Sequence, residues 1–262
     1  MPAKVCVLTI AGSDSGGGAG IQSDLKTFRN HGVFGTTVIT SITAQNTKGV
    51  RSAYELPARI ISEQLCSVLL DYRIKAAKTG MLSGPKVINE IAGQLKKSGI
   101  KLIVDPVIFS KNSYRLLSAS GIKSMRERLF PITYLITPNI PEAEILTGIK
   151  VDSIEHLESS AVVLSEMGVK NVLIKGGHLK SSIGLPLGTD VLFDGKKFYL
   201  FSTNYINTKN THGIGCTLSA AITANLAKGN SLAGSIESAK QYVVKALKKT
   251  VKIGKGYSPV EQ

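Results

Sequence analysis

Short apolar runs and amphipathic stretches alternate along most of the chain. The apolar runs are continuous and rich in Val, Ile and Leu, as expected of parallel strands that are buried on both faces of a sheet. They predict strands at residues 4–12, 33–40, 74–78, 101–106, 134–137 and 171–175.

Between these runs, apolar residues recur every three or four positions, which is the spacing of one helix face. Ile21, Leu25 and Phe28 follow this spacing before Gly32 ends the first helix. The other helices are predicted at residues 57–71, 86–97, 118–129, 153–167, 218–228 and 231–250, with a short one that ends at Gly148.

A few segments depart from the alternation. Residues 41–50 and 109–115 are polar and rich in turn residues, and residues 179–188 show no periodicity. Two short strands near 190–194 and 197–202 are separated by an Asp-Gly pair, which predicts a hairpin.

The alternation of strand and helix predicts one α/β domain over residues 1–262, with a doubly wound, mostly parallel sheet and a small flap or hairpin. We find no internal repeat or linker. Ligands bind beyond the carboxyl ends of the strands in such sheets. The polar turns expected at that edge are Gly12–Gly20, Lys78–Met81, Asp105–Val107, Asn139–Glu142, Lys175–His178 and Thr211–Cys216.

The turn Thr211–Thr217 contains two glycines and leads into a helix. The first N–H groups of a helix have no partner within it and lie at its positive end, so such a turn binds anions, most often phosphate. Cys216 lies at this positive end, where the pKa of a thiol tends to fall. The alternative is a tight turn with a buried cysteine that acts as a small apolar residue.

A second glycine-rich segment, Gly12–Gly20, also opens a helix but matches neither a P-loop nor a Gly-x-Gly-x-x-Gly motif. Asp105, Asn139 and Glu142 supply oxygen ligands suitable for Mg²⁺ at strand ends. Lys175 ends a strand where its charge can meet a phosphate. Each could instead be a turn, helix-start or surface residue, but together they are the components of phosphoryl transfer.

Composition narrows the range of partners. The 262 residues carry a formal net charge of +14, and the densest basic part is residues 238–260, with six lysines and no acid. No known nucleic-acid module accompanies this charge, which therefore favours phosphate-bearing substrates over specific nucleic-acid binding. No apolar run could span a bilayer. Three separated cysteines without metal-like spacing favour a reducing cytoplasm.

Several turns carry longer motifs. The first reads Ala-Gly-Ser-Asp-Ser-Gly-Gly-Gly-Ala-Gly and ends at Gly20, and the last reads Asn-Thr-His-Gly-Ile-Gly-Cys and ends at Cys216. Between them lie Thr43-Ala-Gln-Asn-Thr47, Lys78-Thr-Gly-Met-Leu82, Asp105-Pro-Val107, Thr137-Pro-Asn-Ile-Pro-Glu142 and Lys175-Gly-Gly-His178. In order and along essentially the whole chain, these motifs closely resemble the hydroxymethylpyrimidine/phosphomethylpyrimidine kinases of thiamin biosynthesis, in the ribokinase-like superfamily.

The resemblance implies phosphorylation of 4-amino-5-hydroxymethyl-2-methylpyrimidine by ATP with Mg²⁺, and then of its monophosphate to the diphosphate. It implies that Gln45 hydrogen-bonds the pyrimidine and that Met81 and Val107 pack on its ring. The other substrate contacts expected on this basis are Gly12, Ala19 and Asp24.

The same resemblance implies the reacting groups and the assembly. The residues implied for catalysis are Cys216, Gly213, Gly215 and Lys175. Those implied near the nucleotide phosphates are Lys175, Thr211 and Gly213, and those implied for the metal are Asp105, Asn139 and Glu142. The family is typically homodimeric, and the superfamily usually has Asp where this chain has Cys216.

The chain departs from the family pattern at two places. Residues 108–117 lack the small, glycine-containing composition that many relatives have after Asp-Pro-Val, and Ile214 replaces the commoner Thr. Two other functions stay open: a pyridoxal or pyridoxine kinase of the same superfamily, and a pyrimidine-phosphate sensor without turnover. Gln45 offers both a donor and an acceptor to an aminopyrimidine edge, which favours the pyrimidine.

Overall fold

The computed structural model describes residues 4–176, 186–249 and 252–262. Its strands are β1 (Cys6–Asp14), β2 (Phe34–Asn46), β3 (Gly49–Glu55), β4 (Ile74–Thr79), β5 (Lys101–Val104), β6 (Thr133–Ile136), β7 (Val172–Ile174), β8 (Thr189–Phe193) and β9 (Phe198–Ser202). They form one sheet in the order β3-β2-β1-β4-β5-β6-β7-β8-β9. The strands from β2 to β7 pair in parallel, and antiparallel β3, β8 and β9 complete the two edges.

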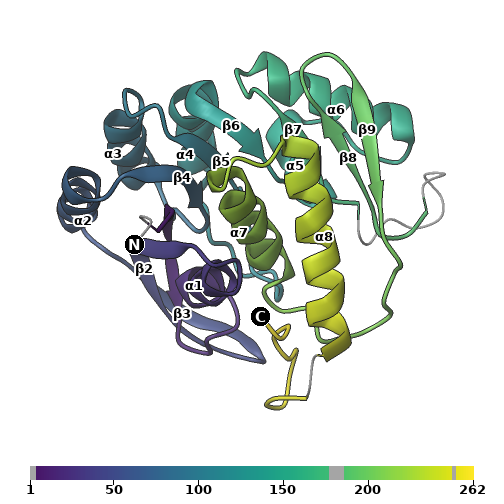
Figure 1. Ribbon diagram of the computed structural model, residues 1–262, viewed down its shortest axis with the longest axis horizontal. Helices are drawn as coiled ribbons and strands as arrows, with labels where there is room; N and C mark the ends of the chain where they lie inside the picture. The colour runs from purple at the N-terminus through teal and green to yellow at the C-terminus, as the bar shows by residue number, and fades with distance from the viewer. Residues whose placement is uncertain (1–3, 177–185, 250–251) are drawn as a thin grey trace.

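Helices cover both faces of the sheet, so the predicted doubly wound fold is confirmed (Figure 1). The helices on one face are α1 (Gly20–Asn30), α7 (Ile214–Ala227) and α8 (Leu232–Lys249). Those on the other face are α2 (Ala58–Asp71), α3 (Pro85–Leu95), α4 (Ala119–Ser124), α5 (Ile140–Thr147) and α6 (Ile154–Glu166). No helix in the described ranges is long and apolar enough to cross a membrane.

The continuous apolar runs arise because successive residues of a central strand enter different layers. In β5, Ile103 packs with α7 and α8, whereas Leu102 and Val104 belong to the core on the opposite face. All three are buried. Since side chains alternate across a strand, a strand covered on both faces needs an apolar residue at every position.

Two predicted elements differ from the structure. Residues 41–50 are not mainly a turn, because β2 continues to Asn46 and pairs with the missed strand β3. The mixed polarity of this flap follows from its exposure, since Ile42 and Ala44 face solvent while Thr43 is buried. The helix predicted at 118–129 divides into α4 and a π-helical turn, Met125–Leu129, followed by a 3₁₀ turn, Phe130–Ile132.

Candidate active site

The polar turns at the carboxyl edge of the sheet meet in one cleft of about 1010 Å³. The turn that precedes α7 closes one side of this cleft, and the β2–β3 flap forms part of another. The predicted site residues that line it are Gly12, Ala19, Gln45, Met81, Asp105, Val107, Asn139, Glu142, Lys175, Thr211, Gly213, Gly215 and Cys216. Of the predicted set, Asp24 alone is outside the lining.

The turn before α7 has the geometry of an anion site. Gly213 caps the helix with φ of 83°, and a Cβ there would collide with the carbonyl oxygen of Gly18. Only glycine accepts both constraints without strain. At Gly215 a Cβ would lie 3.3 Å from Nζ of Lys175, so the absence of a side chain leaves space between the lysine and the free N–H groups of the helix start.

Cys216 does not have the lowered pKa that its place at a helix start suggested. Burial raises the pKa of the Cys216 thiol to about 11. The ammonium of Lys78 lowers this pKa only in part, and the carboxylates of Asp24 and Asp105 raise it further. The predicted thiolate is therefore wrong for the free protein, in which the thiol is protonated at neutral pH. Removal from water therefore outweighs the favourable charge of Lys78.

Lys175 and Asp105 form an ion pair beside the turn. Nζ of Lys175 donates to Oδ1 of Asp105 at 2.9 Å, and only 15% of the lysine side chain is exposed. Burial by itself would lower the pKa of Lys175, but the carboxylates of Asp105 and Glu142 outweigh it and raise the pKa. The lysine is therefore a permanent positive charge at the floor of the cleft.

Asn139 and Glu142 form a reciprocal cap at the start of α5. The N–H of Glu142 donates to Oδ1 of Asn139 at 2.8 Å, and the N–H of Asn139 donates to Oε2 of Glu142 at 2.9 Å. Burial raises the pKa of Glu142 to about 7. The visible role of Asn139 is thus to fix the position of the Glu142 carboxyl, with its own oxygen already engaged.

Part of the cleft is suited to a flat ring. Met81 and Val107 line it, and Sδ of Met81 accepts a hydrogen bond from Oγ of Ser41 at 3.4 Å. A Cβ on Gly12 would lie 2.8 Å from this serine oxygen and 3.1 Å from Sδ of Met81. A larger residue at position 12 would displace the side chain of Met81, and this explains the glycine at this strand end.

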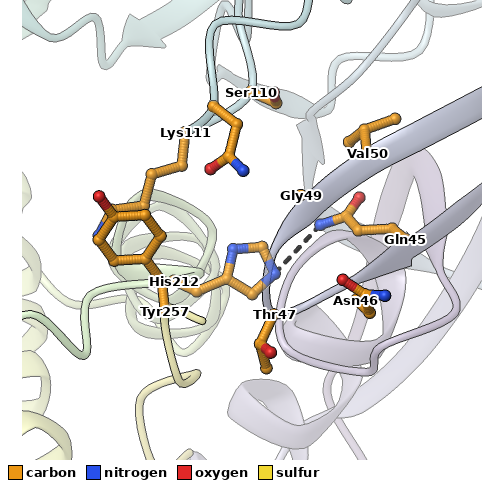
Figure 2. Close-up of a pocket in the computed structure, with 10 residues that line it drawn as sticks. Gln45, Asn46, Thr47, Gly49, Val50, Ser110, Lys111, His212 and Tyr257 are labelled. Atoms are coloured by element: carbon orange, nitrogen blue, oxygen red, sulfur yellow. Dashed lines mark hydrogen bonds between the residues drawn. The ribbon is translucent and has the colours of Figure 1, made fainter. Parts of the chain in front are cut away.

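His212 and Asp14 are site residues that the sequence analysis missed. Figure 2 shows the contact between the side chains of His212 and Gln45 as a dashed line. Nε2 of His212 lies 3.1 Å from Nε2 of Gln45 and 3.0 Å from Oδ2 of Asp14. Asp14 also accepts from the N–H groups of Gly16, Gly18 and Ala19, so it shapes the glycine-rich loop. The Ser-Asp-Ser-Gly sequence is typical of such a turn and could have identified Asp14.

Asp24 is not a substrate contact, contrary to expectation. Its side chain is fully buried below the cleft and accepts two hydrogen bonds of 2.9 Å from Lys78, which is equally buried. Oγ1 of Thr9 donates a third, at 2.6 Å. Burial alone would lower the pKa of Lys78, but Asp24 and its other charged neighbours raise it, so the lysine stays charged in the core.

The structure shows where the two departures from the family pattern lie. Ile214 is the first residue of α7 and does not disturb the left-handed Gly213 before it. Residues 108–117 form a closed rim loop in which the N–H of Ser110 donates to the carbonyl of Tyr114 at 2.8 Å. The Gly-Gly-His part of the Lys175 motif and the expected loop at 179–188 lie largely outside the described residues.

Comparison with known proteins identifies the family of this chain. A family model described as phosphomethylpyrimidine kinase matches residues 14–261. The chain belongs to the phosphomethylpyrimidine kinase family. It is 46% identical over 253 residues to the hydroxymethylpyrimidine/phosphomethylpyrimidine kinase of Bacillus subtilis, which covers 96% of this chain and 92% of that protein.

Solved structures extend the comparison. The phosphomethylpyrimidine kinase from Clostridium difficile is 42% identical, with a TM-score of 0.81 over 93% of this chain and 99% of that one. The pyridoxal kinase from Staphylococcus aureus in complex with AMP-PCP and pyridoxal is 33% identical, with a TM-score of 0.88 over 99% and 93%. The phosphomethylpyrimidine kinase fold is therefore shared with a kinase for a related ring.

Proposed function

We propose that the protein transfers a phosphoryl group from ATP to 4-amino-5-hydroxymethyl-2-methylpyrimidine, and then to the monophosphate to form the diphosphate, in thiamin biosynthesis. The observation that carries this proposal is the single cleft that is lined both by the Gly213–Cys216 anion turn and by Gln45 and Met81 of the proposed ring subsite. Membership of the phosphomethylpyrimidine kinase family supports the same substrate class. The complex of a related kinase with AMP-PCP supports ATP as the donor.

Each part of the chain then has a role in the transfer. Free N–H groups at the start of α7 hold the transferring group, where they act best in a site closed to water. The ammonium of Lys175 neutralises phosphate charge beside them, and Thr211 lies at the rim of the same turn. Cys216 is the proposed general base: its thiolate, which is the minor form in the free protein because the pKa is about 11, accepts the proton of the substrate hydroxyl and becomes the thiol.

Mg²⁺ suits the oxygen ligands at the strand ends. The buried carboxyls of Asp105 and Glu142 both interact with the single ammonium of Lys175. Two acidic groups face one basic group here, so a further positive charge would be favourable. Among the described residues no three His, Cys, Asp or Glu side chains converge as a metal cluster. Mg²⁺ commonly binds through one or two carboxylates plus phosphates and waters. When bound, it would neutralise the charge on the ATP phosphates.

Replacing Glu142 by Gln should raise the Mg²⁺ concentration for half-maximal activity by roughly tenfold or more and lower turnover. The amide keeps the size of the side chain but removes the charge that faces the metal. Titration of activity with MgCl₂ at saturating ATP measures the effect. Glu166→Gln, on the exposed surface of α6, is the matched control. An unchanged Mg²⁺ requirement in Glu142→Gln would contradict the assignment.

Replacing Gln45 by Leu should lower kcat/KM for the pyrimidine alcohol by about 5- to 150-fold, the cost of a polar group left unpaired. Binding of an ATP analogue, measured by calorimetry, should stay within about twofold because Gln45 is a proposed contact of the ring and not of the nucleotide. Gln241→Leu, at an exposed position of α8, makes the same change away from the cleft and is the matched control. Equal losses of alcohol and nucleotide binding would indicate a folding role instead.

A pyridoxal kinase is the second candidate, because the TM-score of 0.88 to the pyridoxal-bound neighbour extends over nearly all of this chain. A coupled ADP-release assay with hydroxymethylpyrimidine, its monophosphate and pyridoxal, side by side, decides between them. The proposal expects turnover of both pyrimidines and a smaller kcat/KM for pyridoxal. Binding of a pyrimidine phosphate without ADP release would favour a sensor.

A homodimer is part of the proposal. Ile42 and Tyr54 face each other across the β2–β3 hairpin, and their exposed fractions are 52% and 66%. Strand β3 is an edge of the sheet. An exposed apolar pair at a sheet edge is typical of a surface that another chain covers.

A further inference from the structure

Residues 253–262 return from the end of α8 to the catalytic face of the molecule. Figure 1 shows this segment passing below α7 and α8 and ending close to α1. It touches the flap, where the N–H of Tyr257 donates to the carbonyl of Thr47 at 2.8 Å, and the rim loop, where Nζ of Lys111 lies 4.3 Å from the centre of the Tyr257 ring. The segment therefore packs against the flap and the rim loop without itself lining the cleft.

The same segment pairs with the backbone of the anion turn. The N–H of His212 donates to the carbonyl of Ser258 at 3.3 Å, and the N–H of Val260 donates to the carbonyl of His212 at 3.1 Å. Ser258 is fully buried and Val260 is 2% exposed. This short bridge fixes both sides of His212, the residue immediately before Gly213.

Gln262 joins the starts of two helices. Its Nε2 lies 2.9 Å from Oγ of Ser23 in α1, 3.2 Å from Oγ1 of Thr217 in α7 and 3.3 Å from the carbonyl of Gly18. Ser23 and Thr217 are completely buried and lie 3.3 Å apart. The amide thus ties the glycine-rich loop to the first turn of α7 at the place where Gly18 and Gly213 are in backbone contact.

We propose that Ser258, Val260 and Gln262 form a positioning element for phosphoryl transfer, in which the side chain of Gln262 holds the anion turn against the glycine-rich loop. This inference rests on the proposed function. No residue of the segment is among those that line the cleft. The segment reaches the site through His212, whose side chain contacts Gln45 and Asp14. It acts by fixing the backbone of the turn that carries the N–H groups of Gly213, Gly215 and Cys216.

The proposal predicts a specific kinetic pattern. Gln262→Met keeps the side-chain length and removes the hydrogen bonds, so kcat should fall by about 10- to 100-fold, as expected when reacting groups are misplaced by up to an ångström. KM for ATP should change by less than about threefold, because binding tolerates a small displacement that the transition state does not. The midpoint of thermal unfolding should fall by only about 2–4 °C.

The test compares Gln262→Met, Glu261→Met and a deletion of residues 258–262. Glu261 is the exposed neighbour and serves as the control, with wild-type kcat expected. Hydrogen exchange of the amides at 213–217 should accelerate in Gln262→Met, while exchange in α3 stays unchanged. Wild-type kcat and wild-type exchange in Gln262→Met would overturn the proposal, whether or not the deletion variant folds.

The two readouts separate this inference from the proposed function. If the wild-type protein phosphorylates neither pyrimidine nor pyridoxal, the proposed function fails, whereas hydrogen exchange at 213–217 still decides whether Gln262 orders the turn. If the wild type is active and Gln262→Met loses activity only in proportion to its unfolded fraction, the segment is a structural element and the positioning role is wrong.

Discussion

Replacing Cys216 by alanine is expected to lower kcat by about 10²- to 10⁴-fold, the contribution typical of a general base. The accepting hydroxyl must lose its proton as the phosphoryl group arrives, and Cys216 lies at the turn that is proposed to hold that group. The alanine leaves the backbone N–H groups of the turn in place. Affinity for ATP should therefore stay within about twofold, so the loss should appear in kcat.

The pH profile tests the same role independently. Because burial raises the pKa of the Cys216 thiol to about 11, the thiolate fraction should increase about tenfold per pH unit below that value. Since kcat/KM reports ionisations of the free enzyme, it should rise between about pH 7 and pH 10 in the wild type and lose this slope in Cys216→Ala. Alkylation by iodoacetamide should follow the same high midpoint.

Cys216→Asp is the conservative comparison. The superfamily resemblance implies that a carboxylate can serve at this position, so this variant should retain partial activity with a flatter pH profile near neutrality. A fully active Cys216→Ala protein with an unchanged pH profile would reduce the cysteine to a packing residue, and catalysis would then rest on the anion turn, Lys175 and Mg²⁺.

Replacing Lys78 by Met should destabilise the fold by about 3–5 kcal/mol, because it leaves the carboxylate of Asp24 buried without a counter-charge. Both side chains of this pair are 0% exposed, so water cannot take the place of the lysine. Domains of ordinary stability have about 5–15 kcal/mol in total. Urea unfolding followed by circular dichroism should show a much lower midpoint with a similar slope.

A double variant separates the charge effect from packing. Lys78→Met combined with Asp24→Leu removes both charges and should recover most of the lost stability, since a buried pair can often be replaced by apolar residues at little cost. Asp24→Asn should lower stability but leave KM for the pyrimidine within about twofold, because Asp24 is outside the cleft. A large increase in KM with normal stability would restore Asp24 as a substrate contact.

The location of the cleft could be predicted because it depends on local patterns. The apolar runs identify the parallel strands, and the polar turn after each strand must then lie at the carboxyl edge of the sheet. The turn at Gly213 could also be predicted, because two glycines directly before a helical run are typical of a turn that opens a helix. The outer end of β2 and the whole of β3 were missed because this flap is largely exposed, and on β2 the solvent-facing Ile42 and Ala44 break the polar alternation expected of an exposed strand.

The sequence by itself determined the α/β fold, the edge of the sheet that carries the cleft, and the anion turn with its neighbouring lysine and carboxylates. Only the tertiary structure decided that Asp24 is a core ion-pair partner, that the Cys216 thiol is protonated, and that His212 meets Asp14 from 198 residues away. The reason is physical. Periodicity and turn chemistry act over a few residues, whereas burial and electrostatic interaction depend on distances in space that the folded chain alone defines.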